Sequence, residues 1–254
     1  MEDLIVYIAL TASVLIGGAA VAFMNPAGER SLKLMLAFSG AFLLGVSFLH
    51  LIPEVYEHGP ANIGVYVLIG FVFQLLLEFF SEGIEHGHVH IHPEAGAKGK
   101  FPIVIMLSLC IHAFVEGIPL EREIHAHYHD TANSFHGHHH GDHSLLMGVV
   151  FHNIPVSIAL MTMFLKSGLN NIKAFLYLGI FAIMGPLGTF TGHHFGESIS
   201  GNLEHFFEIV LAVVVGMFMH ISTTILFESS ENHRFNLYKF IAIISGVLVA
   251  MVNF

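Results

Sequence analysis

His112 and Glu116 are a histidine and a carboxylate four residues apart, within an apolar stretch that runs from Phe101 to Leu120. On a helix, positions i and i+4 lie on one face, so both side chains would point the same way. An ionised glutamate deep in a membrane costs about 2.5–3.5 kcal/mol on insertion scales. Glu116 therefore needs a partner, which can be a metal ion, a proton or another cation.

A second polar motif, His152-Asn153-Ile154-Pro155, follows in another apolar segment. If both segments are helical, they run antiparallel and the two motifs can face each other at mid-depth. Two imidazoles, a carboxylate and an amide oxygen suit Zn²⁺ and also accept other first-row divalent ions. The predicted metal ligands are His112, Glu116, His152 and Asn153. The alternative is a core histidine bonded to Glu116 with no metal.

Pro155 stands directly beyond these ligands in the second segment. Proline has no N–H, so one backbone carbonyl of the preceding turn loses its helical partner and the helix kinks. We expect this local opening to give the ion access to the site.

Five more polar residues stand in or at the ends of other apolar segments and are candidates for an ion pathway: His50, Glu54, Gln74, Glu78 and His220. His50 and Glu54 are an i, i+4 pair at one end of a segment, where they can form an outer station. Gln74 and Glu78 have the same spacing and, with His220, can line an inward exit. The alternative for Gln74 and Glu78 is a polar helix end that emerges from the membrane.

The composition is that of an integral membrane protein. Of the 254 residues, 54% are hydrophobic and only 11% are charged, whereas a soluble domain carries about 25% charged residues. The mean hydropathy is +0.72. A formal net charge of −10 argues against nucleic acid as a partner. The single cysteine, Cys110, excludes intrachain disulfides and zinc sites built from cysteines.

Because a bilayer core of about 30 Å needs about 20 apolar residues per helix, hydropathy predicts an all-α protein with eight transmembrane helices in one domain, residues 1–254. The expected spans are residues 4–24, 32–54, 61–84, 101–120, 145–165, 172–195, 205–228 and 235–254. The first span follows two acidic residues, Glu2 and Asp3, so we expect a retained helix rather than a signal peptide.

The basic residues predict the orientation. With both termini outside, eight of the nine Lys and Arg residues fall on the inner side: Arg30, Lys33, Lys98, Lys100, Lys166, Lys173, Arg234 and Lys239. Arg122 alone falls outside, which is a strong positive-inside bias.

Two predicted loops are rich in histidine, a cytoplasmic one at about residues 85–100 and an extracytoplasmic one at about residues 121–144. Histidine tracts bind transition metals through neutral imidazole. We expect these loops to capture or sense metal; the alternative is a polar linker with no such role.

With these motifs, the sequence resembles the ZIP (Zrt/Irt-like) family of divalent-metal transporters over nearly its whole length. The resemblance includes the eight spans, the histidine-rich loop after the third, and His50-Leu51-Ile52-Pro53-Glu54 at the end of the second. In the fourth span the family pattern is His-Asn-x-x-(Asp/Glu)-Gly, which His112 and Glu116-Gly117 match. In the fifth span, His152, Asn153 and Pro155 match.

Three positions depart from the family pattern: Ala113 replaces an Asn, Val156 stands where a metal-binding Glu or His is expected, and Gly185 stands where bacterial members carry a Glu. All three changes remove ligands that the family uses for a second metal or to bridge the pair. The resemblance therefore implies a single-ion site. It also implies a ZIP-like helix bundle, a homodimer, and alternating access by sliding one helix bundle against another.

The leading hypothesis is transport of a divalent metal, foremost zinc uptake, with Fe²⁺, Mn²⁺ or Cd²⁺ as further candidate substrates, and no enzymatic activity. We expect a multi-pass protein of the plasma (inner) membrane of a bacterium, in contact with membrane lipid. One alternative is a membrane-bound metalloenzyme that acts on lipids; another is a metal sensor or storage protein whose bundle does not conduct.

Overall fold

The computed structural model describes residues 2–24, 29–81, 103–121, 144–200, 203–228 and 237–252. Its helices are α1 (Glu2–Met24), α2 (Glu29–Val46), η1 (Ser47–Leu51), α3 (Ile52–His58), α4 (Ile63–Ser81), α5 (Ile103–Gly117), α7 (Ser144–Lys166), α8 (Asn171–Ala182), α9 (Met184–Ser200), α10 (Leu203–Glu228) and α11 (Leu237–Ala250). The all-α prediction is therefore confirmed for these residues. Apart from Glu121 and Ser144, both histidine-rich loops lie outside the described residues, as do Lys98, Lys100, Arg122 and Arg234.

Each predicted span coincides with a helical stretch. Six stretches are long and apolar enough to cross a membrane: 4–23, 31–58, 63–81, 144–166, 171–192 and 205–227. The other two helices, α5 and α11, are apolar but shorter, with 15 and 14 residues. The number of crossings and the side of each terminus stay predictions.

The second stretch extends to His58, beyond its predicted end at residue 54, because the helix widens rather than stops. Residues Ser47–Leu51 form a π-helical turn, and Pro53 stands in the first turn of α3 that follows. Proline has no N–H for the carbonyl four residues earlier and its ring clashes with it. A wider turn at this point lets the helix continue past Pro53.

The stretch 171–192 is divided into two helices where one uniform span was expected. Ile183 separates α8 from α9, although its own backbone stays helical and its N–H donates to the carbonyl oxygen of Gly179. Pro186 follows in the first turn of α9. Proline is tolerated in the first turn of a helix, where its missing N–H is not needed. At the other end, the Asn170 side chain accepts a hydrogen bond from the backbone N–H of Lys173 (2.9 Å), which caps the start of α8.

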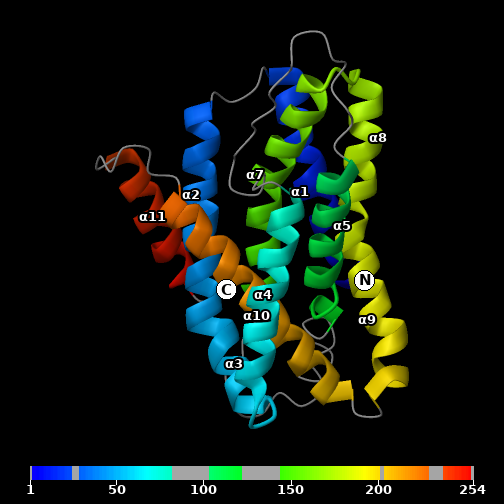
Figure 1. The fold of residues 1–254 in the computed structure, drawn as a ribbon, viewed down its shortest axis with the longest axis vertical. Coiled ribbons are helices and arrows are strands. Elements are labelled where there is room, and N and C mark those ends of the chain that lie inside the picture. The colour runs from blue at the N-terminus through cyan, green and yellow to red at the C-terminus, as the bar shows by residue number, and fades with distance from the viewer. Residues whose placement is uncertain are drawn as a thin grey trace.

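We group the described helices into two bundles, although α2 packs against α7 about as extensively as against α10. Bundle A consists of α1, α5, α7, α8 and α9, and bundle B of α2, α3, α4, α10 and α11. Figure 1 shows α2 and α11 at one side of the molecule and α5, α8 and α9 at the other. Contacts between the bundles run mainly along α2 with α7 and α4 with α5.

Glycines allow the closest helix approaches within each bundle. A Cβ atom on Gly188 of α9 would overlap the carbonyl oxygen of Phe114 in α5, and one on Gly216 of α10 would overlap the carbonyl oxygen of Val67 in α4. Both seams are therefore backbone-to-backbone contacts, as in membrane helix pairs with small interfacial residues. Between the bundles, Gly148 of α7 instead faces the side chain of Leu43 in α2.

Candidate metal centre

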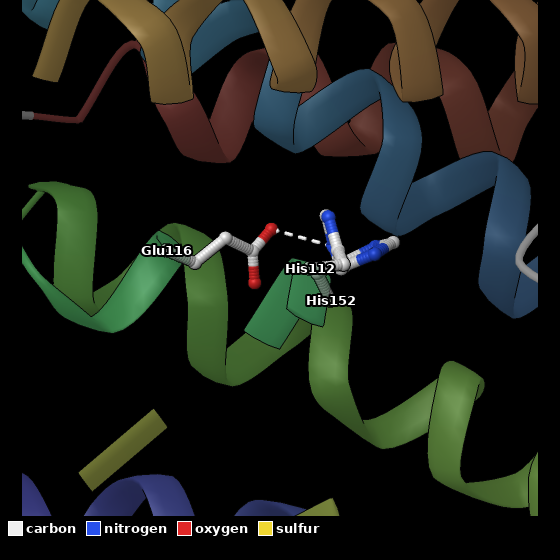
Figure 2. Close-up of side chains that lie close together, drawn as sticks. All are labelled: His112, Glu116 and His152. Carbon is white, nitrogen blue, oxygen red and sulfur yellow. Dashed lines mark ion pairs between the residues drawn. The ribbon is translucent and has the colours of Figure 1, made fainter. Parts of the chain in front are cut away.

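Three buried side chains meet between α5 and α7. One ligand atom from each of His112, Glu116 and His152 lies within 4.8 Å of the others. His112 Nε2 is 2.8 Å from Glu116 Oε1, and the two imidazole rings lie 6.0 Å apart and nearly perpendicular. Figure 2 shows the Glu116 carboxylate directed at the two rings. The i, i+4 pairing predicted for α5 is present, and the second helix adds a histidine as expected.

The three side chains are closed off from solvent. Glu116 is fully buried, and His112 and His152 are at most 2% exposed. Within the described residues, Glu116 Oε2 has no hydrogen-bond partner. A buried carboxylate oxygen in that position is costly to leave unmatched, so the arrangement favours a cation beside it. The His112–Glu116 contact also fits the alternative of a bonded core pair, but that alternative gives no role to His152.

The site lies at the end of α5 rather than at its middle. His112 and Glu116 occupy the last two turns, because α5 ends at Gly117, and Pro119 follows. The carboxyl end of a helix carries a partial negative charge. A cation bound beside Glu116 is therefore favoured by the α5 backbone as well as by the carboxylate.

Asn153 lines a small cavity together with Glu116, and neither His112 nor His152 lines that cavity. Asn153 is 6% exposed, and the cavity has a volume of about 10 Å³, room for about one water molecule. Ala113 and Gly185, two of the three positions that depart from the family pattern, line the same cavity. The third, Val156, is 2% exposed and belongs to the hydrophobic core instead.

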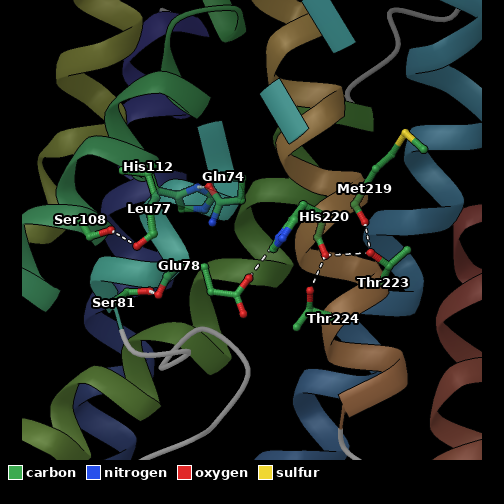
Figure 3. Close-up of polar contacts among 10 residues, drawn as sticks. All are labelled: Gln74, Leu77, Glu78, Ser81, Ser108, His112, Met219, His220, Thr223 and Thr224. Carbon is green, nitrogen blue, oxygen red and sulfur yellow. Dashed lines mark hydrogen bonds and ion pairs between the residues drawn. The ribbon is translucent and has the colours of Figure 1, made fainter. Parts of the chain in front are cut away.

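The predicted pathway residues fall into three places (Figure 3 shows the first two). Gln74 of α4 reaches the site, with its Oε1 3.0 Å from His112 Nδ1. Glu78, one turn further along α4, pairs with His220 of α10 through a contact of 3.3 Å between Oε2 and Nδ1. His50 is remote from both: its Nε2 lies 3.1 Å from the carbonyl oxygen of Ala250 at the end of α11.

Glu54 lies one turn beyond His50, in α3, and is half-buried. Its backbone carbonyl lies 3.2 Å from His58 Nδ1. Neither His50 nor Glu54 is brought to the metal centre, so the outer station proposed for them stays separate from it.

Two buried carboxylates were not predicted. Glu121, just beyond α5, is 3% exposed, and Glu208, in α10, is 1% exposed. Gly192 of α9 approaches Cβ of Glu121 and the ring of Phe207, the residue before Glu208. Glu208 stands in the apolar run of its span, which could have marked it in the sequence. Glu121 falls at a predicted loop boundary, where a carboxylate carries no such signal.

Comparison with known proteins finds similarity to zinc transporters. A family model described as "ZIP Zinc transporter" matches residues 101–253, which include α5, α7 and the whole candidate centre. Zinc transporter ZIP9 of Xenopus tropicalis is 26% identical over 140 residues, covering 54% of this chain and 42% of that protein. Zinc transporter SLC39A7 of Rattus norvegicus is 34% identical over 111 residues, covering 33% of this chain and 24% of that protein.

The aligned region thus spans less than half the length of these relatives. The family match nevertheless covers more than half of this chain, and it is a match to transporters rather than to membrane enzymes that act on lipids. This chain belongs to the ZIP zinc transporter family.

Proposed function

We propose that this protein carries divalent metal ions, foremost Zn²⁺, across a membrane through the site formed by His112, Glu116, His152 and Asn153. The observation that carries the proposal is the convergence of two imidazoles and a carboxylate within 4.8 Å, inside a bundle of apolar helices. Nitrogen and carboxylate donors suit Zn²⁺, and also Fe²⁺, Mn²⁺ and Cd²⁺ to differing degrees. The zinc transporters among its relatives support zinc as the first substrate to test.

The proposal includes a single ion per site. Beyond Glu116, the cavity offers only Asn153 as a further polar side chain, because Ala113 and Gly185 contribute no ligand atoms there. Its volume of about 10 Å³ holds about one water molecule. These features support one ion held by His112, Glu116 and His152, with Asn153 or a water completing the shell.

We propose alternating access in which bundle A slides against bundle B. The three closest donors all belong to bundle A, on α5 and α7, so the ion can travel with that bundle. Backbone-to-backbone glycine seams hold each bundle together, whereas side chains such as that of Leu43 separate the two. Interfaces made of side chains can slide at lower cost than interlocked backbones.

We further propose that Glu78 and His220 form a station on the ion's way out, on bundle B. The pair is largely buried, with side chains 19% and 6% exposed. Glu78 is one helical turn from Gln74, which touches His112, so the station lies about 6 Å along α4 from Gln74. His50 in η1 and Glu54 in α3, just beyond the carboxyl end of α2, remain candidates for an outer station.

The homodimer, the plasma (inner) membrane location and the metal-binding role of the histidine-rich loops are further parts of this proposal. They derive from the family resemblance and from composition. None of these three proposals affects the metal centre itself.

The test is uptake of Zn²⁺ into proteoliposomes that contain the purified chain. Replacing His112 or Glu116 by Ala removes a donor and should reduce uptake at least about 10-fold, because each ligand contributes to a three-donor site. His194→Ala is the matched control, since this histidine is exposed on α9 and stacks on Phe190. Unchanged uptake in both site variants would refute the site. Metal binding by the wild-type chain without any flux would favour a sensor or storage protein.

A further inference from the structure

We propose that Gln74 is a positioning residue for the metal centre: its side-chain oxygen orients the His112 ring and fixes which ring nitrogen faces the metal. This inference rests on the proposed metal site. It assigns to Gln74 a role through His112 rather than a place among the ligands, and it makes one metal ligand of bundle A depend on a residue of bundle B.

The first step concerns the hydrogen bond itself. Gln74 Oε1 lies 3.0 Å from His112 Nδ1, and an amide oxygen can only accept. Nδ1 must therefore be the nitrogen that carries the proton. In a neutral imidazole the other nitrogen, Nε2, then has its lone pair available.

The second step concerns where Nε2 points. It lies 2.8 Å from Glu116 Oε1, on the side of the ring where His152 and Glu116 converge (Figure 2). The bond to Gln74 thus places the one nitrogen that can bind a metal beside the other two donors. Metal-binding histidines usually donate their second ring N–H to a fixed acceptor in this way, and losing that acceptor costs about 10- to 100-fold in metal affinity.

The third step concerns the strength of the contact. Gln74 is fully buried and His112 is 2% exposed, so water does not compete for this bond. A neighbouring bond, from Ser108 Oγ to the carbonyl oxygen of Leu77 (2.6 Å), also joins α5 to α4 (Figure 3). Both bonds connect α4 to α5, but of these two only the bond to Gln74 involves a proposed metal ligand, His112. Removing the Ser108 bond is therefore a matched control for removing the Gln74 bond.

The experiment compares three variants with the wild-type full-length chain. Gln74→Leu keeps the size of the side chain but removes the acceptor, Gln74→Glu retains an acceptor oxygen at the same reach, and Ser108→Ala removes only the neighbouring bond. Zn²⁺ affinity is measured by calorimetry on the purified protein, and KM and maximal rate by uptake into proteoliposomes. Thermal unfolding is measured for each variant.

Gln74→Leu should weaken Zn²⁺ affinity about 10- to 100-fold and raise KM, while the rate at saturating Zn²⁺ changes little. Gln74→Glu should restore the affinity to within a few-fold of wild type, and Ser108→Ala should change thermal stability without changing affinity. If Gln74→Leu does not fold, Gln74→Asn serves instead, because its shorter amide cannot reach Nδ1 and should show the same loss.

Three results would overturn the inference: wild-type affinity in Gln74→Leu, failure of Gln74→Glu to restore affinity, or equal effects of Gln74→Leu and Ser108→Ala on affinity. Because affinity is measured on the purified protein, the inference is tested even if the wild-type chain gives no flux. That last outcome would count against the proposed transport function alone.

Discussion

At the scale of single residues, the metal centre is partly a local product of the sequence and partly a product of packing. His112 and Glu116 were predictable as a pair, because helical spacing alone places them on one face. The meeting with His152 follows only if two helices pack at the right depth, and the second polar motif, in another apolar segment, suggested it. The hydrogen bond that His112 donates to Gln74 had no local signal, since 38 residues separate them and only the packing of α4 against α5 joins them.

The three departures from the family pattern lead to a prediction about stoichiometry. Ala113 and Gly185 line the cavity beside Glu116 without offering a ligand atom, and Val156 is packed in the core. We expect one intramembrane zinc ion per protomer in crystals grown with Zn²⁺, located by anomalous scattering at the zinc edge. The peak should disappear in His112→Ala. A second peak inside the bundle would contradict the single-ion site.

At the scale of helices, hydropathy located the elements well because a membrane helix must be apolar along about 20 residues. It could not locate the interruption at Ile183 or the π-helical turn at Ser47–Leu51, because both leave the apolar run unbroken. Pro186 and Pro53 mark these places in the sequence. Whether a proline ends, kinks or widens a helix depends on its neighbours in space.

The helix α4 leads to a prediction of its own, because it presents Gln74 and Glu78 one turn apart toward two different histidines. Glu78→Gln removes the charge that pairs with His220 and should slow release from the proposed station. We expect the maximal rate of Zn²⁺ uptake to fall severalfold while calorimetric affinity at the metal centre is unchanged. Both are measured as for Gln74.

Ser81→Ala is the control for this variant. It removes a hydrogen bond to the Glu78 backbone carbonyl but leaves the carboxylate in place. A normal rate in Glu78→Gln, or an equal loss in Ser81→Ala, would argue against the station.

At the scale of the whole molecule, the proposed sliding of bundle A against bundle B predicts that a covalent link between the bundles stops transport. Leu43 of α2 and Gly148 of α7 face each other across the bundle interface, and a Cβ on Gly148 would lie 3.2 Å from Leu43 Cδ1. Cysteines at both positions, in a Cys110→Ala background, can be joined by a short bifunctional thiol reagent with a reducible link. Zn²⁺ uptake should fall to background after cross-linking and return after reduction.

The control joins two helices of the same bundle. A Cβ on Gly40 of α2 would lie 3.2 Å from Cβ of Ile225 in α10, so cysteines there can be cross-linked within bundle B. This link should leave uptake intact. Full uptake by the cross-linked Leu43 and Gly148 pair would mean that the two bundles do not slide during transport.

The position of Glu116 one residue before the end of α5 has a further consequence, for the energy barrier on each side of the ion. At 1.5 Å per residue, the 15-residue α5 is about 22 Å long, shorter than the hydrocarbon layer of about 30 Å. His112 and Glu116 lie in its last two turns. The distance from the carboxyl end of α5 to the metal centre is therefore the shorter of the two distances through the low-dielectric layer. The longer path runs from the metal centre back along the rest of α5, beside Gln74 and Glu78 of α4. In the proposed uptake, an ion would enter over the shorter distance through the low-dielectric layer, and most of the polar side chains would line the longer exit path.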